Sequence, residues 1–208
     1  SKIILSHNSQ DKIWENSILM IGGYETDFKE QSESLINTIT QQGYFPNRIY
    51  IDQYSENNVF WGTTDSLINQ MERGVSFINF LGHGGGAVWG DRSLFRLNDL
   101  DRLNNNNKLP FITSMTCFTG DVTNPNALGR KMLIKANGGA SGWFGSSGIA
   151  WLINDYLLLQ PLIKRLFSDQ SMSIGQLINE AKMEYLFTNT VYPDIAISQI
   201  FQFNLNHL

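Results

Sequence analysis

Short apolar runs alternate along the chain with stretches whose apolar residues recur at helical spacing. The runs predict buried strands and the periodic stretches predict amphipathic helices. Strands are expected at residues 18–21, 48–51, 75–81, 109–115 and 140–144. Helices are expected at residues 28–42, 63–73, 97–103, 126–136, 152–167, 173–186 and 193–203. This alternation is typical of an α/β fold in which helices cover a mostly parallel sheet.

The pattern predicts a single domain over residues 1–208. A chain of 208 residues is long enough for one α/β domain with a sizeable core. It contains no internal repeat, no block of like charges and no Pro-rich linker. Because it lacks an initiating Met and a signal-peptide pattern, we expect it to be excised from a longer chain.

Composition excludes several classes of function. The formal net charge is −4 and the pI is near 5.3, so the chain lacks the basic footprint of a nucleic-acid-binding protein. No apolar stretch approaches the ~18 residues that indicate a membrane span. The single cysteine excludes an intramolecular disulfide and a multi-cysteine zinc site. Since no acidic cluster has the spacing of a calcium loop either, we expect no metal and no cofactor.

Two of the expected strands end in residues that are suited to chemistry. His83 lies in the segment NFLGHGGG after the strand 75–81, and Cys117 lies in SMTCFTGD after the strand 109–115. Ligands of open parallel sheets bind beyond the carboxyl ends of the strands. If these two strands are adjacent and parallel, with helix 97–103 in the crossover, both residues emerge at the same edge of the sheet.

A cysteine and a histidine placed in this way are suited to act as a nucleophile and its acid–base partner. The thiolate is the reactive form of cysteine, and a nearby imidazole can take up the thiol proton and return it to a leaving group. Glycines around His83 allow the backbone to approach a substrate carbonyl. The backbone N–H groups of Gly84 and Cys117 are therefore candidates for an oxyanion hole.

Residue chemistry alone leaves alternatives open. A lone cysteine at a strand end is often a small buried residue, and a histidine among glycines is often a turn residue. The glycine-rich loop also suggests phosphate binding, although it lacks the P-loop spacing and its lysine. An HGGG segment also occurs in esterases, but the expected G-x-S-x-G elbow is absent from this sequence.

The motifs and their order resemble the gingipain family of cysteine peptidases, which has a caspase-like fold. The resemblance covers residues from about 18 to 205. It rests on the following segments: Phe80-Leu81-Gly82-His83-Gly84 with Trp89, Ser114 through Asp121, the glycine-rich stretch 137–148, and Phe203-Asn204-Leu205, which is similar to the last helix of the family. It extends to sortase-like members of the type IX secretion pathway. The implied architecture is a caspase-like three-layer sandwich with a mostly parallel sheet between helices.

The resemblance also implies roles for particular residues. Cys117 corresponds to the nucleophile and His83 to the general acid–base, with Gly84 and Cys117 supplying the oxyanion N–H groups. Glu25 occupies the place of an acidic residue that orients the histidine, and Asp27 is its rival. Alternatively, both carboxylates only favour the start of the following helix, where negative charge is stabilising.

Three further residues are predicted to bind substrate. Trp151 occupies the place where the family often has an aromatic wall of the S1 pocket, and its alternative is an ordinary core tryptophan. Trp89 and Thr116 are the other two. Members specific for Arg or Lys have an acidic residue at the base of S1, for which Asp121 and Asp155 are the nearest candidates. The preference at P1 is therefore open.

These inferences together predict a cysteine endopeptidase that cleaves peptide or protein substrates through a thioester intermediate. The resemblance further implies adjacent domains and an extracellular or cell-surface location. Alternatives are a sortase-like transpeptidase, a non-catalytic binding or assembly module of the same fold, and a small-molecule hydrolase with a deep closed pocket.

Overall fold

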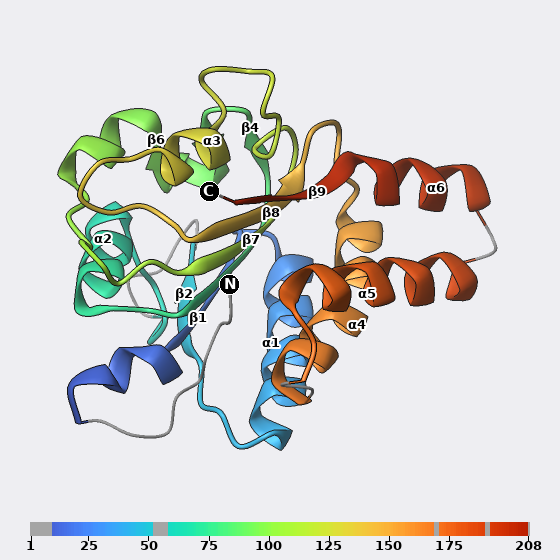
Figure 1. Ribbon diagram of the computed structural model, residues 1–208, viewed down its shortest axis with the longest axis horizontal. Coiled ribbons are helices and arrows are strands. Elements are labelled where there is room, and N and C mark those ends of the chain that lie inside the picture. Colours follow the sequence, from blue (N-terminus) through green and yellow to red (C-terminus); the bar gives the residue numbers. More distant parts are fainter. Residues whose placement is uncertain (1–9, 52–57, 169–170, 190–191, 208) are drawn as a thin grey trace.

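A six-stranded sheet crosses the centre of this computed structural model, which describes residues 10–51, 58–168, 171–189 and 192–207 (Figure 1). The strand order is β2-β1-β3-β7-β8-β9. The first five strands in this order are parallel and β9 is antiparallel. Their bounds are β1 (Ile18–Gly22), β2 (Asn47–Tyr50), β3 (Phe77–Leu81), β7 (Phe111–Met115), β8 (Gly142–Ser146) and β9 (Phe203–His207).

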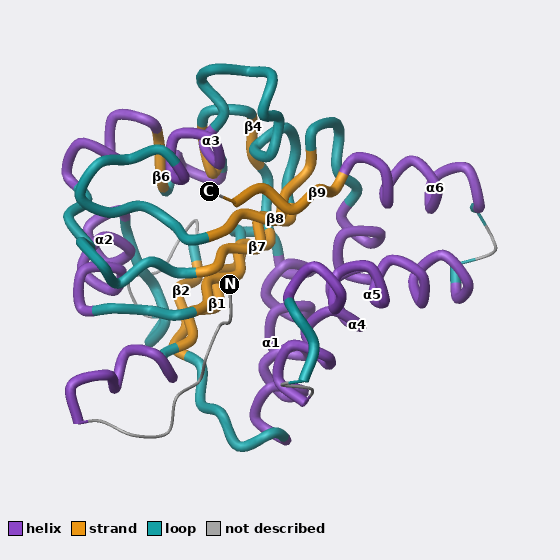
Figure 2. Tube along the Cα trace, viewed as in Figure 1, coloured by secondary structure: helices purple, strands orange, loops and turns teal. Residues whose placement is uncertain are grey.

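Helices cover both faces of the sheet, as Figure 2 shows. The α-helices are α1 (Thr26–Gln41), α2 (Thr64–Arg73), α3 (Leu128–Leu133), α4 (Leu152–Ser168), α5 (Ile174–Thr188) and α6 (Pro193–Gln202). Short 3-10 helices are η1 (Gln10–Asn16), η2 (Asp91–Ser93) and η3 (Leu97–Arg102). Helices α1, α4 and α5 lie against one face, and α2, α3 and η3 lie on the other side (Figure 1). The predicted α/β three-layer sandwich is confirmed.

Alternate side chains of each central strand enter two separate apolar cores. In β1, Ile18 and Met20 pack with α1, α4 and α5, whereas Leu19 and Ile21 pack with α2 and α3. Period-2 geometry sends successive side chains to opposite faces, so a strand that is apolar throughout must be covered on both. Each fully buried large aliphatic side chain contributes roughly 1.5–3 kcal/mol. This double burial explains why these strands appear in the sequence as continuous apolar runs.

An ion pair fixes α1 beside the edge strand β2. Arg48 donates from Nε and Nη2 to the two carboxylate oxygens of Glu33, at 2.8 and 3.1 Å. The hydroxyl of Tyr50 donates to the same carboxylate. Although burial acts in the opposite direction, the hydrogen bonds from Arg48 and Tyr50 hold the pKa of Glu33 below its ordinary value. This contact orients the helix whose N-terminal end lies at the candidate site.

The structure corrects three details of the predicted elements. Residues 203–205 begin the edge strand β9 rather than belonging to a last helix, because Asn204 and Asn206 alternate with buried or half-buried apolar neighbours. Helix α3 begins at Leu128, since Ala127 before it has an extended backbone. A small antiparallel sheet, which the sequence did not predict, comprises β4 (Gly84–Gly85), β5 (Val88–Trp89) and β6 (Phe95–Arg96).

Two glycines with positive φ allow a matched stability test. Gly139, between α3 and β8, has φ +100°, and a Cβ there would lie 2.0 Å from the carbonyl oxygen of Met132. Gly43 has φ +88° with no atom within 4 Å of such a Cβ. We expect Gly43→Ala to cost about 1–2 kcal/mol for the backbone conformation alone. Gly139→Ala should cost several kcal/mol in urea unfolding, because it adds a steric clash. Equal losses for the two variants would contradict this explanation.

Candidate active site

The carboxyl ends of three neighbouring strands bring three of the predicted residues to one edge of the sheet. Leu81 of β3 pairs with Gly22 of β1 on one side and with Met115 of β7 on the other. Glu25 lies three residues after Gly22, and His83 and Cys117 each lie two residues after this paired row. Since neighbouring strands are about 4.8 Å apart, the topology places these three residues in the order β1, β3, β7 along one edge.

The imidazole of His83 is held from two directions. Its Nε2 lies 3.0 Å from Oε1 of Glu25, and the ring packs edge-on against Phe28 with 5.2 Å between centroids. The side chains of His83 and Glu25 are 59% and 40% exposed, so solvent reaches the pair. An exposed pair of this kind is worth no more than about 1 kcal/mol, so it orients the ring without adding much stability.

The sulfur of Cys117 lies beside the peptide group of Ala150. The N–H of Ala150 donates to Sγ at 3.4 Å, and Sγ lies 3.8 Å from the carbonyl oxygen of the same residue. Phe118, with φ +59°, turns the chain sharply after the half-buried cysteine. The N–H of Phe118 then donates to the carbonyl of Gly148 at 2.9 Å. The loop after β8 therefore supports the cysteine turn directly.

The backbones of the two loops meet at Gly84. A Cβ at this position would lie 2.6 Å from Oγ1 of Thr116, the residue before Cys117, so only glycine fits without displacing its neighbour. Among the described residues, the backbone N–H of Cys117 donates to no protein acceptor. A backbone N–H left without a protein partner at a strand end is suited to an incoming oxyanion.

The structure places two of the predicted substrate-binding residues in the interior. Trp89 is 1% exposed, stacks against Phe80 and Trp143, and donates from Nε1 to the hydroxyl of Ser114 at 2.8 Å. Thr116 is 2% exposed and packs against Gly84. A side chain without accessible surface has no face to offer a peptide. We therefore assign both residues to the packing beneath the site and do not retain a substrate contact for them.

Trp151 has the exposed position that a substrate wall requires. It is 52% exposed and directly follows Ala150. Its backbone N–H donates to Oδ1 of Asp155 at 3.3 Å. Further exposed apolar side chains follow the ends of β1, β7 and β8: Tyr24, Phe118, Ile149 and Ile153. Phe118, Ile149 and Ile153 were not singled out in the sequence, because Phe118 and Ile149 are single apolar residues in loops and Ile153 lies in the first turn of α4.

The two acidic residues considered for the base of S1 have other contacts. Asp155 is 3% exposed, and the side-chain amide of Gln199 donates to it alongside the N–H of Trp151. Burial raises the pKa of Asp155 to about 7. Asp121 accepts from the hydroxyl and the N–H of Thr123, and the hydroxyl hydrogen bond lowers its pKa. Asp155 therefore accepts hydrogen bonds within the interior, and Asp121 accepts them within its own turn.

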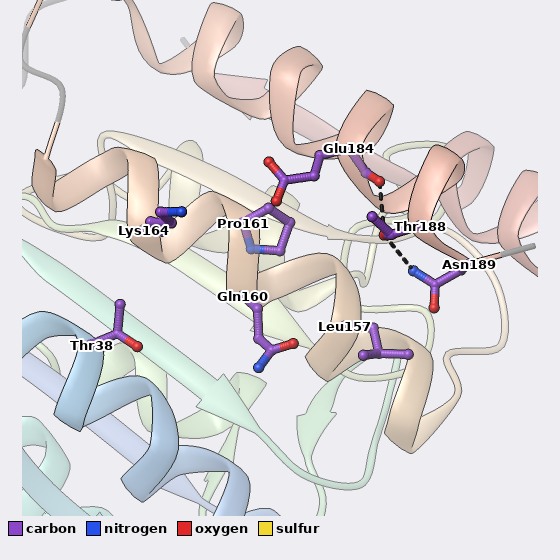
Figure 3. Close-up of a pocket in the computed structure, with 8 residues that line it drawn as sticks. All are labelled: Thr38, Leu157, Gln160, Pro161, Lys164, Glu184, Thr188 and Asn189. Atoms are coloured by element: carbon purple, nitrogen blue, oxygen red, sulfur yellow. Dashed lines mark hydrogen bonds between the residues drawn. The ribbon is translucent and has the colours of Figure 1, made fainter.

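A pocket of about 440 Å³ lies elsewhere in the molecule, between α1, α4 and α5 (Figure 3). Its lining residues are Thr38, Leu157, Gln160, Pro161, Lys164, Glu184, Thr188 and Asn189. Thr38 lies near the C-terminal end of α1, whereas Glu25 precedes the N-terminal end of that helix. The pocket is therefore separate from the strand-end site.

Within the described part of the chain, no three His, Cys, Asp or Glu residues are grouped as metal ligands would be. None of its helices combines the length and the apolar character that a membrane span needs.

Comparison with known proteins identifies one family. A sequence profile described as Peptidase family C25 matches residues 1–206. Gingipain R2 of Porphyromonas gingivalis is 34% identical over 121 residues, which cover 54% of this chain and 15% of that protein. Gingipain R1 of the same organism has the same identity over 121 residues, and 11% of that protein is covered.

Solved structures show the same fold. The Arg-specific cysteine proteinase gingipain R superposes with a TM-score of 0.77 at 18% identity, covering 93% of this chain and 46% of that one. The complex of the pro- and mature domains of RgpB from Porphyromonas gingivalis gives a TM-score of 0.76 at 18% identity, covering 93% and 47%. The chain thus spans about half the length of these solved chains and a smaller share of the curated relatives.

The buried carboxyl of Asp155 predicts an unusual dependence of stability on pH. Its pKa is about 7 in the folded protein and near 3.8 when it is freely solvated. Between these values the folded state holds a proton that the unfolded state has lost, so stability contributed by this group falls as pH rises from about 4 to about 7. We expect Asp155→Asn to remove that decline in urea unfolding measured across this range.

Asp121→Asn is the matched control, because the pKa of Asp121 is shifted downward instead. It should leave the decline between pH 4 and 7 in place. A stability difference between wild type and Asp155→Asn that stays constant across the range would contradict the assignment.

Proposed function

Because the chain belongs to peptidase family C25, we propose that it is the catalytic domain of a cysteine endopeptidase in which Cys117 and His83 form the working dyad. The gingipain-like family and caspase-like fold predicted from the motifs are confirmed. The observation that most directly supports the dyad is the strand register. His83 and Cys117 each lie two residues beyond the paired residues Leu81 and Met115 on adjacent parallel strands.

In the first half of the reaction, the thiol proton of Cys117 passes to the imidazole of His83. The sulfur attacks the carbonyl carbon of the peptide bond, and the N–H of Ala150 stabilises negative charge on the sulfur until the new C–S bond forms. The carbonyl oxygen becomes an oxyanion, which accepts hydrogen bonds from the backbone N–H groups of Gly84 and Cys117. The imidazolium of His83 then protonates the leaving amine as the C–N bond breaks, which leaves a thioester.

In the second half, His83 takes a proton from a water molecule while the oxygen of that water attacks the carbonyl carbon of the thioester. A second tetrahedral oxyanion forms and is stabilised by the same two N–H groups. The C–S bond breaks, the carboxylic acid product leaves, and the sulfur of Cys117 regains a proton from His83. The cycle consumes one water and one peptide bond and leaves the enzyme unchanged.

Glu25 sets the orientation and tautomer of His83 in this scheme. A neutral imidazole has one N–H and one acceptor nitrogen. Since the carboxylate of Glu25 accepts from Nε2, the acceptor nitrogen is Nδ1, and it is Nδ1 that exchanges protons with Cys117.

The exposed apolar residues around Cys117 suit a peptide substrate better than a small polar one. Trp151 is the proposed wall for the P1 side chain, and Phe118 and Ile149 extend the apolar surface beside it. We propose peptide or protein chains as the substrate class. The extracellular or cell-surface location and the adjacent domains expected from the family resemblance belong to the same proposal.

The main alternatives differ in what they predict for the cysteine. A transpeptidase shares the acylation half and delivers the acyl group to an amine, so added amines would appear in its product. A binding module has no need for a Glu25–His83 pair at the strand end next to the only cysteine. A small-molecule hydrolase requires an enclosed pocket, whereas Trp151 and His83 are both open to solvent.

Covalent labelling tests the dyad. We expect peptidyl chloromethyl or acyloxymethyl ketones with varied P1 residues to modify Cys117, as detected by mass spectrometry of tryptic peptides. Cys117→Ala and His83→Ala should each abolish turnover of peptide substrates while the thermal unfolding midpoint changes little, because both residues lie in loops outside the two cores. The proposal would be contradicted if no probe modified Cys117, either in this chain or in a longer form of it.

Replacement of Glu25 tests the orientation of His83. Glu25→Ala should lower kcat by up to about fivefold, because the exposed ion pair contributes no more than about 1 kcal/mol. Glu25→Gln should restore most of the activity, since its amide oxygen still accepts from Nε2. Asp27→Ala is the matched control in the first turn of α1 and should keep wild-type kcat. If Asp27→Ala proves the more damaging of the two alanine variants, Glu25 has been assigned wrongly.

A further inference from the structure

A chain of buried hydrogen bonds joins the loop of His83 to the turn of Cys117. Trp89 belongs to β5, in the loop region that follows His83, and its Nε1 donates to the hydroxyl of Ser114 at 2.8 Å. The Ser114 hydroxyl lies 2.9 Å from that of Thr119, two residues after Cys117. Exposed fractions are 1% for Trp89 and 0% for both hydroxyl residues. We refer to these three residues as the Trp89–Ser114–Thr119 chain.

The two hydroxyl residues bracket the nucleophile. Ser114 lies in β7, three residues before Cys117, and the hydrogen bond to Thr119 therefore closes the turn that contains the cysteine. The backbone of Thr119 is held as well, because the N–H of Gly129 donates to its carbonyl at 2.9 Å. The position of the Cys117 backbone N–H thus depends on a turn that is fixed at both ends.

Trp89, the third member of the chain, pairs with Gly84, which is the other proposed oxyanion donor. Trp89 is the residue directly opposite Gly84 in the β4–β5 pair, and the N–H of Gly90 donates to the carbonyl of His83 at 2.7 Å. Anchoring the indole of Trp89 to Ser114 therefore anchors the strand that carries Gly84. The separation of the Gly84 and Cys117 N–H groups is set by side chains beneath them as well as by the sheet.

Stability alone does not require polar groups at this place. Buried hydrogen bonds add little net stability, and replacing both partners of such a bond by apolar groups of the same shape can be nearly neutral. Directional bonds differ from apolar packing in that they fix the distance between the groups they join. The surrounding residues Phe80 and Trp143 already supply apolar packing for Trp89.

We propose that Ser114 and Thr119 are positioning residues, which hold the Gly84 and Cys117 N–H groups at the spacing that an oxyanion needs. The inference rests on the proposed cysteine peptidase activity. Oxyanion donors act on the transition state rather than on bound substrate. Loosening the chain therefore lowers kcat and leaves KM nearly unchanged.

Thr119→Val tests this inference, and Thr113→Val is its matched control. Thr113 lies next to Ser114 in β7 but faces the opposite core, where its hydroxyl donates to Asn79 at 2.8 Å. Both variants replace a fully buried hydroxyl by a methyl group and break a side-chain hydrogen bond of similar length, and Thr113→Val also removes a longer contact of 3.5 Å to the carbonyl of Ile78. They should therefore lower the urea midpoint by similar amounts, so any difference in activity has another cause.

We expect Thr119→Val to lower kcat about tenfold with KM within about twofold of wild type, a smaller loss than the 10²–10³ that follows removal of an oxyanion donor. Thr113→Val should keep kcat within about twofold of wild type. Thr119→Ser, which restores the hydroxyl, should recover most of the lost kcat. If Thr119→Val yields too little folded protein, Ser114→Ala interrupts the same chain and is expected to show the same selective loss of kcat.

The outcomes separate the two proposals. Wild-type protein that neither cleaves peptides nor reacts with peptidyl ketones overturns the peptidase function and this inference with it. If wild type is active, three results overturn the inference alone: unchanged kcat in Thr119→Val, equal loss of kcat in the two valine variants, or no recovery in Thr119→Ser.

Discussion

The parallel pairing of β3 with β7 is the constraint on which the candidate site depends. It places Leu81 opposite Met115, and the next two residues of each strand lead to His83 and Cys117. A shift of one residue would move the cysteine relative to the histidine by about 3.3 Å and turn every side chain of the strand to the other face. Because both faces are packed with apolar residues, such a shift would disrupt two cores at once. The register, and with it the placement of His83 and Cys117 at one edge of the sheet, is therefore enforced by burial.

This dependence explains what the sequence could and could not predict. Continuous apolar runs identified the central strands, and the residues after them identified His83 and Cys117. Glu25 was harder to separate from Asp27, since both precede or begin the same helix. Only the structure shows that Glu25 lies 3.0 Å from Nε2 of His83, whereas Asp27 lies in the first turn of α1. A difference of two residues at a helix start is below the resolution of pattern analysis.

Trp89 and Thr116 show a different limit of prediction from the sequence. Both belong to the motifs around His83 and Cys117 and were predicted to bind substrate. A residue of such a motif can instead point into the protein and pack beneath the site. Trp89 enters the core and binds Ser114 there, while Thr116 fills the space beside Gly84. The strand β9 escaped prediction for a related reason, because its pairing with β8 is a tertiary contact with only a weak period-2 signal of its own.

The positions of the groups at this site are fixed mainly by the backbone. His83 and Glu25 are open to water, and their pairing orients the imidazole while contributing no more than about 1 kcal/mol. The loops beneath them are joined by backbone hydrogen bonds, among them Phe118 N–H to Gly148 and Leu128 N–H to Gly86. The proposed nucleophile and oxyanion donors are thus held by backbone hydrogen bonds, whereas the proposed acid–base group is held by an exposed ion pair and one ring contact. This division fits the proposed reaction, in which the oxyanion forms at one fixed point while the imidazole exchanges protons in turn with the sulfur, a leaving amine and water.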